Sequence, residues 1–180
     1  MTSQDKLPPQ NIEAEKSLLG CLMIDPVSIY KVVDFLLLKD FYKAQHSKIY
    51  DTILELFEKR EPVDILSVSA KLKVKNELDE VGGASYLTEL VNAVPTASHI
   101  ANYAKIVQEK RILRELISAG YEISEIAQQE TEDVDSLLDR AEKKIFSIAQ
   151  KNLSQSFSHI KDSMEETWQR IDELSKNQGG

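Results

Sequence analysis

The chain has 180 residues, of which 42% are hydrophobic and 29% charged, with a formal charge of −8 and only 6 glycines and 5 prolines. This composition excludes a disordered chain, and its few turn residues favour an all-α fold over an all-β fold. The acidic balance argues against a surface that binds nucleic acid through its phosphates, so only weak DNA binding is expected. The single cysteine allows no internal disulfide, and no apolar run approaches the length of about 18 residues that spans a membrane, so a cytoplasmic location is expected.

Residues 1–97 are predicted to form a compact bundle of about five short helices. The prolines within residues 7–10 predict an extended arm, and Asn11 is a favourable N-cap for the helix that follows. Asp25 and Pro26 are expected to end that helix and to begin the next one. Later boundaries are expected at Asp64, Gly82-Gly83 and Pro95. The apolar residues that recur at helical spacing, and therefore predict the core, are Ala14, Leu18, Cys21, Leu22, Ile29, Val32, Val33, Leu36, Ile49, Tyr50, Ile53, Leu54 and Phe57.

Residues 98–150 are predicted to form a long antiparallel helical hairpin. A helical pattern runs to about Gln128, an acidic break follows at 130–133, and a second helical pattern begins at Val134. The first of these helices has apolar residues on more than one side, whereas its partner in a hairpin can cover only one. We therefore expect a second copy of the chain to cover the surplus, with Leu137 and Ile145 taking part in self-association.

Residues 151–180 are predicted to be a linker that contains one amphipathic helix. Residues 152–158 are polar and rich in serine, as flexible linkers are. The helix after them carries an apolar stripe, and no other part of the chain is expected to cover it. The end of the chain after this linker helix predicts a fragment that stops before a further domain. The stripe consists of Ile160, Met164, Trp168, Ile171 and Leu174.

The sequence offers no recognisable catalytic, cofactor or metal site. It contains no Walker phosphate loop, no dinucleotide-binding glycine motif and no zinc-protease motif. His46 falls on the apolar side of a helix and is interpreted as a satisfied core histidine, and Cys21 as a buried, unreactive thiol. A plain turn is the favoured interpretation of Gly82-Gly83, and Tyr86 fits either the core or a surface groove. An enzyme with an unrecognised site is the least favoured hypothesis.

Many short motifs in order give the chain a specific resemblance to a known family. They include Leu7-Pro8-Pro9-Gln10-Asn11-Ile12-Glu13-Ala14-Glu15, Leu19-Gly20, Asp40-Phe41-Tyr42, His46, Pro62-Val63-Asp64, Gly82-Gly83, Ser85-Tyr86-Leu87, Pro95-Thr96-Ala97, Tyr103-Ala104-Lys105-Ile106-Val107, Glu142 and Ala149. Over essentially its whole length the chain resembles the N-terminal domain and linker of bacterial DnaB-type replicative DNA helicases. The alternative is a stand-alone helical adaptor or a protein similar to a helicase loader.

The resemblance implies partners rather than catalysis by this piece. It implies pairing of hairpins between subunits, a collar built as a trimer of dimers on a hexameric ring, and docking of the linker-helix stripe on a neighbouring motor domain. That RecA-like motor domain, which would use ATP and Mg²⁺, would follow this piece of chain. A DnaG-type primase and a helicase loader are the implied protein partners. The positions that match the family's primase contact are Glu13, Tyr86, Ile117 and Ile123.

Overall fold

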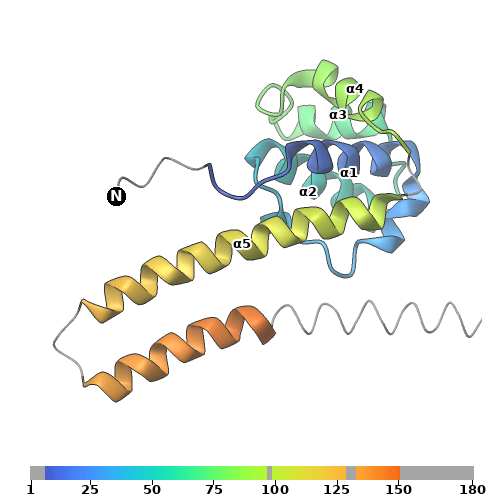
Figure 1. The fold of residues 1–180 in the computed structure, drawn as a ribbon. Helices are drawn as coiled ribbons and strands as arrows, with labels where there is room; N and C mark the ends of the chain where they lie inside the picture. The colour runs from blue at the N-terminus through green and yellow to red at the C-terminus, as the bar shows by residue number, and fades with distance from the viewer. Residues whose placement is uncertain (1–6, 97–98, 129–132, 151–180) are drawn as a thin grey trace, which may run out of the picture. The chain divides into compact units, whose positions relative to one another are not determined.

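A computed structural model of the chain describes residues 7–96, 99–128 and 133–150, and the regular elements among them are all helices (Figure 1). The chain divides into two compact units, one that ends at Glu115 and one that begins at Leu116. Within the described residues no helix is both long enough and apolar enough to cross a membrane. The named elements are α1 (Ile12–Ile24), the 3-10 helices η1 (Pro26–Lys31) and η2 (Leu38–Asp40), α2 (Ala44–Glu58), α3 (Ile65–Val74), α4 (Gly83–Asn92) and α5 (Ile100–Ala127).

The core of the first unit lies between its four short α-helices and the beginning of α5. Helix α1 packs against both α2 and α4, and α3 packs against the same two helices. The apolar stripes predicted from the sequence supply this core, which confirms the predicted bundle. Its fully buried members include Leu18, Leu19, Cys21, Leu22, Val32, Ile49, Tyr50, Ile53, Val68, Leu72, Leu87 and Leu90.

Side-chain caps fix the helix starts that the sequence predicts. The Asn11 side chain accepts a hydrogen bond of 2.9 Å from the backbone N–H of Ala14 and begins α1. The Asp64 carboxylate accepts one of 2.8 Å from the N–H of Ser67 and begins α3. Such caps satisfy backbone donors that have no partner within the first helical turn.

The segment after Asp25 differs from an ordinary α-helix. Asp25 caps it and Pro26 begins it, as predicted, but the element is the short 3-10 helix η1. It ends at Lys31 and is followed by the C-cap residue Val32, whose φ of −133° lies outside the helical range. Bonds from Val33 to Ile29 and from Leu36 to Val32 keep the turns that follow compact, so the predicted apolar positions still reach the core.

Helix α5 starts within the first unit and continues into the second. Ile100, Ala104 and Val107, on its first turns, are buried in the core of the bundle. The first unit therefore extends to Glu115, beyond the boundary at residue 97 that the sequence analysis expects. One helix thus belongs to both units. A domain boundary placed just after Pro95 does not predict this.

The second unit pairs the last turns of α5 with a helix over residues 134–150. The two helices run side by side in opposite directions (Figure 1), and an ion pair joins Glu122 to Lys144. The second helix begins at a cap in which the Asp133 carboxylate accepts a 2.9 Å hydrogen bond from the N–H of Ser136. Ala119 and Ile148 are buried within this unit. The predicted linker and its stripe, at residues 151–180, lie outside the described residues.

Candidate partner-binding surfaces

Tyr86 sits on α4 with its ring against a buried histidine. The Nε2 atom of His46 lies 2.7 Å from the Tyr86 hydroxyl, and the two rings stack at 5.9 Å between centroids with an angle of 10° between their planes. Burial raises the pKa of Tyr86, and a hydrogen bond from Gln45 opposes that shift. Tyr86 is half-buried, so its ring belongs partly to the core and partly to the surface, which combines the two alternatives that the sequence leaves open.

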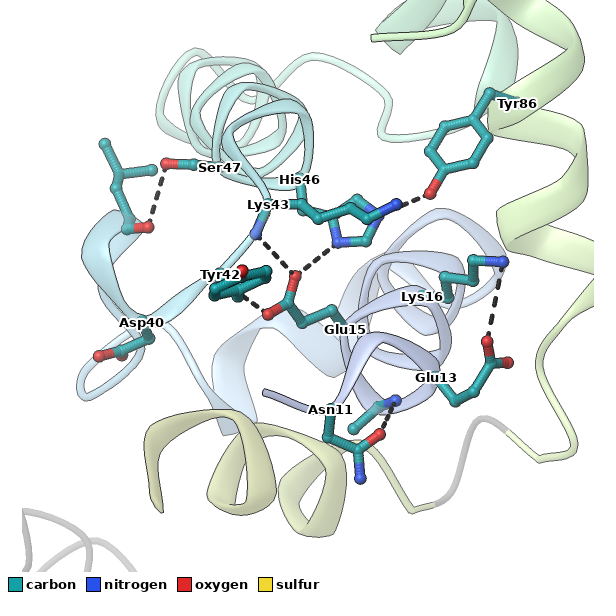
Figure 2. A network of polar contacts seen from close by, with 12 residues as sticks. Asn11, Glu13, Glu15, Lys16, Asp40, Tyr42, Lys43, His46, Ser47 and Tyr86 are labelled. Carbon is teal, nitrogen blue, oxygen red and sulfur yellow. Dashed lines mark hydrogen bonds and ion pairs between the residues drawn. The ribbon is translucent and has the colours of Figure 1, made fainter. Parts of the chain in front are cut away.

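Behind His46 lies a buried carboxylate, Glu15, which comes from α1. Its oxygens accept hydrogen bonds from the N–H of Tyr42 at 2.7 Å and from the N–H of Lys43 at 3.4 Å. One of them also lies 2.6 Å from Nδ1 of His46 (Figure 2). Lys43 is the N-cap of α2 and provides no side-chain cap of its own. Glu15 therefore stands in as the cap of a neighbouring helix and holds His46 at the same time.

Charged side chains surround Tyr86 on the face shared by α1 and α4. Lys16 forms an ion pair with Glu89 on α4 at 2.8 Å and a longer one with Glu13 at 3.8 Å. Tyr86 is three residues before Glu89 on α4, so the two side chains lie on adjacent turns of the same side of that helix. Figure 2 shows Glu13, Lys16 and Tyr86 together with the buried Glu15 and His46. The structure thus brings together two of the four residues that the resemblance implies for primase, Glu13 and Tyr86.

The other two implied primase contacts belong to the second unit. Ile117 is exposed and Ile123 is half-buried, both on the second half of α5. Residues six apart on an α-helix point about 120° away from each other, so the two side chains occupy different sides of α5.

An apolar groove lies on the helix of residues 134–150. Leu138 is 62% exposed and Phe146 is 61% exposed. Large apolar side chains that gather on one exposed surface are typical of sites that bind another protein. Ile145, predicted to take part in self-association, lies in this groove and is exposed, whereas Leu137 is half-buried. The groove is lined by Leu138, Ala141, Glu142, Ile145, Phe146 and Ala149.

Two arginines tie the first half of α5 to the bundle. The Arg111 guanidinium forms an ion pair of 2.5 Å with the buried carboxylate of Asp40 and one of 2.6 Å with Glu115. Arg114 donates to the backbone oxygens of Pro9 and Asp40, each at 2.8 Å, and lies over the ring of Tyr42. These contacts join the N-terminal arm and the turn before α2 to the first half of α5.

The predictions for the histidine and the cysteine are confirmed. His46 is fully buried with both ring nitrogens hydrogen-bonded, as a satisfied core histidine should be. Cys21 is buried as well, and its burial raises the pKa of the thiol to about 11. Among the described residues, no group of three or more His, Cys, Asp or Glu side chains is placed to hold a metal ion.

Sequence reasoning predicts a core position for His46 but misses buried charged residues such as Glu15 and Arg111. It interprets Glu15 as a charge at a helix start, yet Glu15 is three and seven residues from Leu18 and Leu22 and so shares their buried face. An acidic residue on an apolar stripe is a signal of a buried, partnered carboxylate. Arg111 is a similar case, since it is four residues after the buried Val107.

Comparison with known proteins identifies related chains. The model of the family described as DnaB-like helicase N terminal domain matches residues 7–109. The chain is 39% identical over 175 residues to the replicative DNA helicase DnaB of Geobacillus stearothermophilus and covers 38% of it, while 97% of this chain is matched. It is 42% identical over 175 residues to the replicative DNA helicase DnaC of Bacillus subtilis, again with 97% of this chain and 38% of the relative. The chain thus spans well under half the length of these curated relatives.

Solved structures agree with the sequence relatives. The crystal structure of the N-terminal domain of DnaB helicase from Mycobacterium tuberculosis matches with a TM-score of 0.72 and 37% identity, over 78% of this chain and 99% of that one. A second match is the structure of a DnaB-like replicative helicase and its interactions with primase, with a TM-score of 0.65 and 27% identity, over 78% of this chain and 31% of that one. Both likenesses support the all-helical fold described above.

Proposed function

The chain belongs to the family of DnaB-like helicase N-terminal domains, and from this premise we propose that it serves as part of the collar of a hexameric replicative DNA helicase in the cytoplasm. In this role it catalyses nothing itself. It joins subunits to one another through its second unit, and it recruits a DnaG-type primase to the replication fork. Its acidic balance fits a protein-binding role, with only weak binding to DNA.

The observation that carries the proposal is the exposed apolar groove on the helix of residues 134–150. Burying a side chain the size of leucine, isoleucine or phenylalanine stabilises an interface by about 1.5–3 kcal/mol, so a few such residues can hold a dimer together. Leu138, Ile145 and Phe146 supply them. We therefore propose a second copy of the chain as the occupant of the groove and a trimer of such dimers as the collar.

The primase contact is proposed on two surfaces. The first is formed by Glu13 and Tyr86, which share the face of α1 and α4. The second is the latter half of α5, where Ile117 is exposed on one side of the helix and Ile123 is half-buried on another. An acid, an aromatic ring and an exposed aliphatic group are a combination that suits a protein partner better than a phosphate backbone.

The remaining parts of the proposal concern the whole helicase. The relatives are much longer than this chain, and we propose that a RecA-like motor domain binds ATP and Mg²⁺ in the full-length protein. The stripe from Ile160 to Leu174 would dock on the motor domain of the neighbouring subunit, and a helicase loader would be a further partner. In the full-length protein, Trp168→Ala is then expected to lower DNA-dependent ATPase activity while primase binding stays intact.

Binding of the primase to purified variants tests the recruitment role. The probe is the DnaG-type primase encoded by the same genome, titrated against the wild-type chain by calorimetry. Glu13→Lys and Ile117→Asp are each expected to weaken binding by about tenfold or more, which corresponds to at least about 1.4 kcal/mol. Glu58→Lys makes the same charge change at an exposed residue of α2 and is expected to bind as the wild type does. A wild-type chain without affinity for the primase, or equal losses in all three variants, contradicts the proposal.

A further inference from the structure

The buried chain of hydrogen bonds from Glu15 to His46 to Tyr86 has a defined direction. A carboxylate only accepts hydrogen bonds, so the ring nitrogen beside Glu15, Nδ1, carries the proton. In the neutral imidazole the other nitrogen is then an acceptor, because one ring nitrogen donates and the other accepts. With the His46 ring neutral, Nε2 accepts a hydrogen bond from the Tyr86 hydroxyl 2.7 Å away.

This direction determines what Tyr86 can offer to another molecule. A tyrosine hydroxyl has one hydrogen to donate, and here it points inward to Nε2 of His46. The oxygen can still accept, and the Gln45 amide interacts with it in that sense. The nearly parallel imidazole lies beyond the hydroxyl end of the ring, with 5.9 Å between the centroids, so the remaining acceptor position of the oxygen is the part left for a partner.

We propose that His46 is a positioning residue that fixes Tyr86 as a hydrogen-bond acceptor, so that this surface selects a partner side chain that donates, namely a lysine or an arginine. The assignment of a partner to this surface rests on the proposed function. Glu15 takes part by holding the tautomer of His46. Neither His46 nor Glu15 touches the partner, because both are buried.

The charges around Tyr86 favour the same kind of partner group. Glu13 and Glu89 present their carboxylates on this face, with 80% and 55% of their side chains exposed. The face already stabilises one cation, since the pKa of Lys16 is raised, chiefly by its hydrogen bond to Glu89. A donor that is itself cationic would meet a hydroxyl oxygen and two carboxylates, whose combined negative charge exceeds the single positive charge of Lys16 between them.

The tautomer of His46 can be measured without any partner. Long-range ¹H–¹⁵N correlation spectra of the chain labelled at histidine nitrogens distinguish protonated from unprotonated ring nitrogens, and the loss of signals in His46→Gln assigns them among the three histidines. We expect His46 with Nδ1 protonated and Nε2 unprotonated. A proton on Nε2, in either the neutral or the cationic ring, overturns the proposal.

The effect on the partner is measured by a double-mutant cycle with the same primase. Tyr86→Phe keeps the ring and removes the hydroxyl, so it is expected to weaken binding by about tenfold. His46→Gln is expected to weaken binding in the wild-type background but by less than about twofold in the Tyr86→Phe background. Equal losses from His46→Gln in both backgrounds overturn the positioning role, and unchanged binding by Tyr86→Phe overturns the selection of a donor.

A matched variant separates positioning from stability. The hydroxyl of Tyr50, on the same helix as His46, donates to the backbone oxygen of Leu36 at 3.3 Å inside the core. Tyr50→Phe is expected to lower the melting temperature and leave primase affinity unchanged, whereas a parallel loss of affinity would mean that stability alone explains the cycle. A primase that does not bind the wild-type chain refutes the proposed function and the choice of partner, while the tautomer measurement still decides whether His46 fixes the Tyr86 hydroxyl.

Discussion

A single missing methyl group allows α1 and α4 to approach each other closely. A Cβ atom at Gly20 would lie 2.2 Å from the backbone oxygen of Leu90 and 2.4 Å from Cγ2 of Val94. Relieving such a contact would require a shift of the backbone of α4, the helix that also carries Tyr86. Gly20 therefore links the packing of the first unit to the geometry of the candidate partner surface.

Gly20→Ala is expected to destabilise the first unit by about 1–3 kcal/mol, since overpacking a dense core forces backbone shifts. Chemical denaturation followed by circular dichroism measures the change. Gly120→Ala is the control, because a Cβ there meets nothing within 4 Å on an exposed position of α5. Alanine is the better helix former by up to about 1 kcal/mol, so this variant should be as stable as the wild type or more so. A neutral Gly20→Ala would contradict the close packing.

The thiol of Cys21 should make stability depend on alkaline pH. Its pKa is raised to about 11 in the folded chain, while an unfolded cysteine ionises near about 8.5. Between these values the unfolded chain has lost a proton that the folded chain keeps, so stability is complete below the unfolded pKa and falls as the pH rises toward 11. Cys21→Ala should show a smaller loss over this interval in denaturation curves. An identical slope in the variant would show that Cys21 does not titrate as described.

The beginning of α5 depends on a buried ion pair. Burial raises the pKa of Asp40, while the N–H of Leu37 and the charge of Arg111 act against that rise. Burial likewise works against ionised Glu115, but the hydrogen bonds and charges of Arg111 and Lys39 together outweigh it, so the pKa of Glu115 is lowered. Arg111 thus stabilises two carboxylates, one on each side of the junction between α5 and the bundle.

Arg111→Ala is expected to cost about 3–5 kcal/mol, because it leaves the carboxylate of Asp40 buried without its counter-ion. Lys39→Ala removes an exposed ion pair to the same Glu115, at 3.5 Å, and is expected to cost less than about 1 kcal/mol. Urea denaturation of both variants at neutral pH makes the comparison. Equal losses would mean that the buried pair contributes no more than a surface one.

The helices of the first unit could be predicted from the sequence because each has a local signal. Asn11, Asp64 and the Gly82-Gly83 turn mark starts, and the apolar spacing identifies the buried faces. The extent of the first unit could not be predicted in the same way. It depends on contacts between residues far apart in sequence, such as Arg114 with Pro9 and Arg111 with Asp40, which no local pattern contains.

The candidate surfaces were predictable in part. Spacing alone indicates surplus apolar residues on the first helix of the hairpin, whereas the exposed apolar groove that includes Ile145 lies on the second helix. The grouping of Glu13 with Tyr86, by contrast, follows from the packing of α1 on α4. The role of Glu15 as a cap for α2 needs the fold, because the capped N–H groups are 27 and 28 residues away in the chain.

Two substitutions on the helix of residues 134–150 are expected to affect the second unit in different ways. Leu137 is half-buried, so Leu137→Asp is expected to unfold the pairing with α5 and to lower the helical content. Ile145 is exposed in the groove, so Ile145→Asp should leave the helical content unchanged and affect only contacts with other molecules. Circular dichroism on both variants checks this division, and equal helical loss in the two would contradict it.

Sedimentation of the purified chain over a concentration series tests the assembly role most directly. A reversible increase in mass from monomer to dimer is expected for the wild type, because a second copy would cover the apolar groove. A folded monomer is expected for Ile145→Asp at every concentration. A wild-type chain that stays monomeric at high micromolar concentration, or an Ile145→Asp variant that dimerises as the wild type does, would contradict the proposed function of the groove.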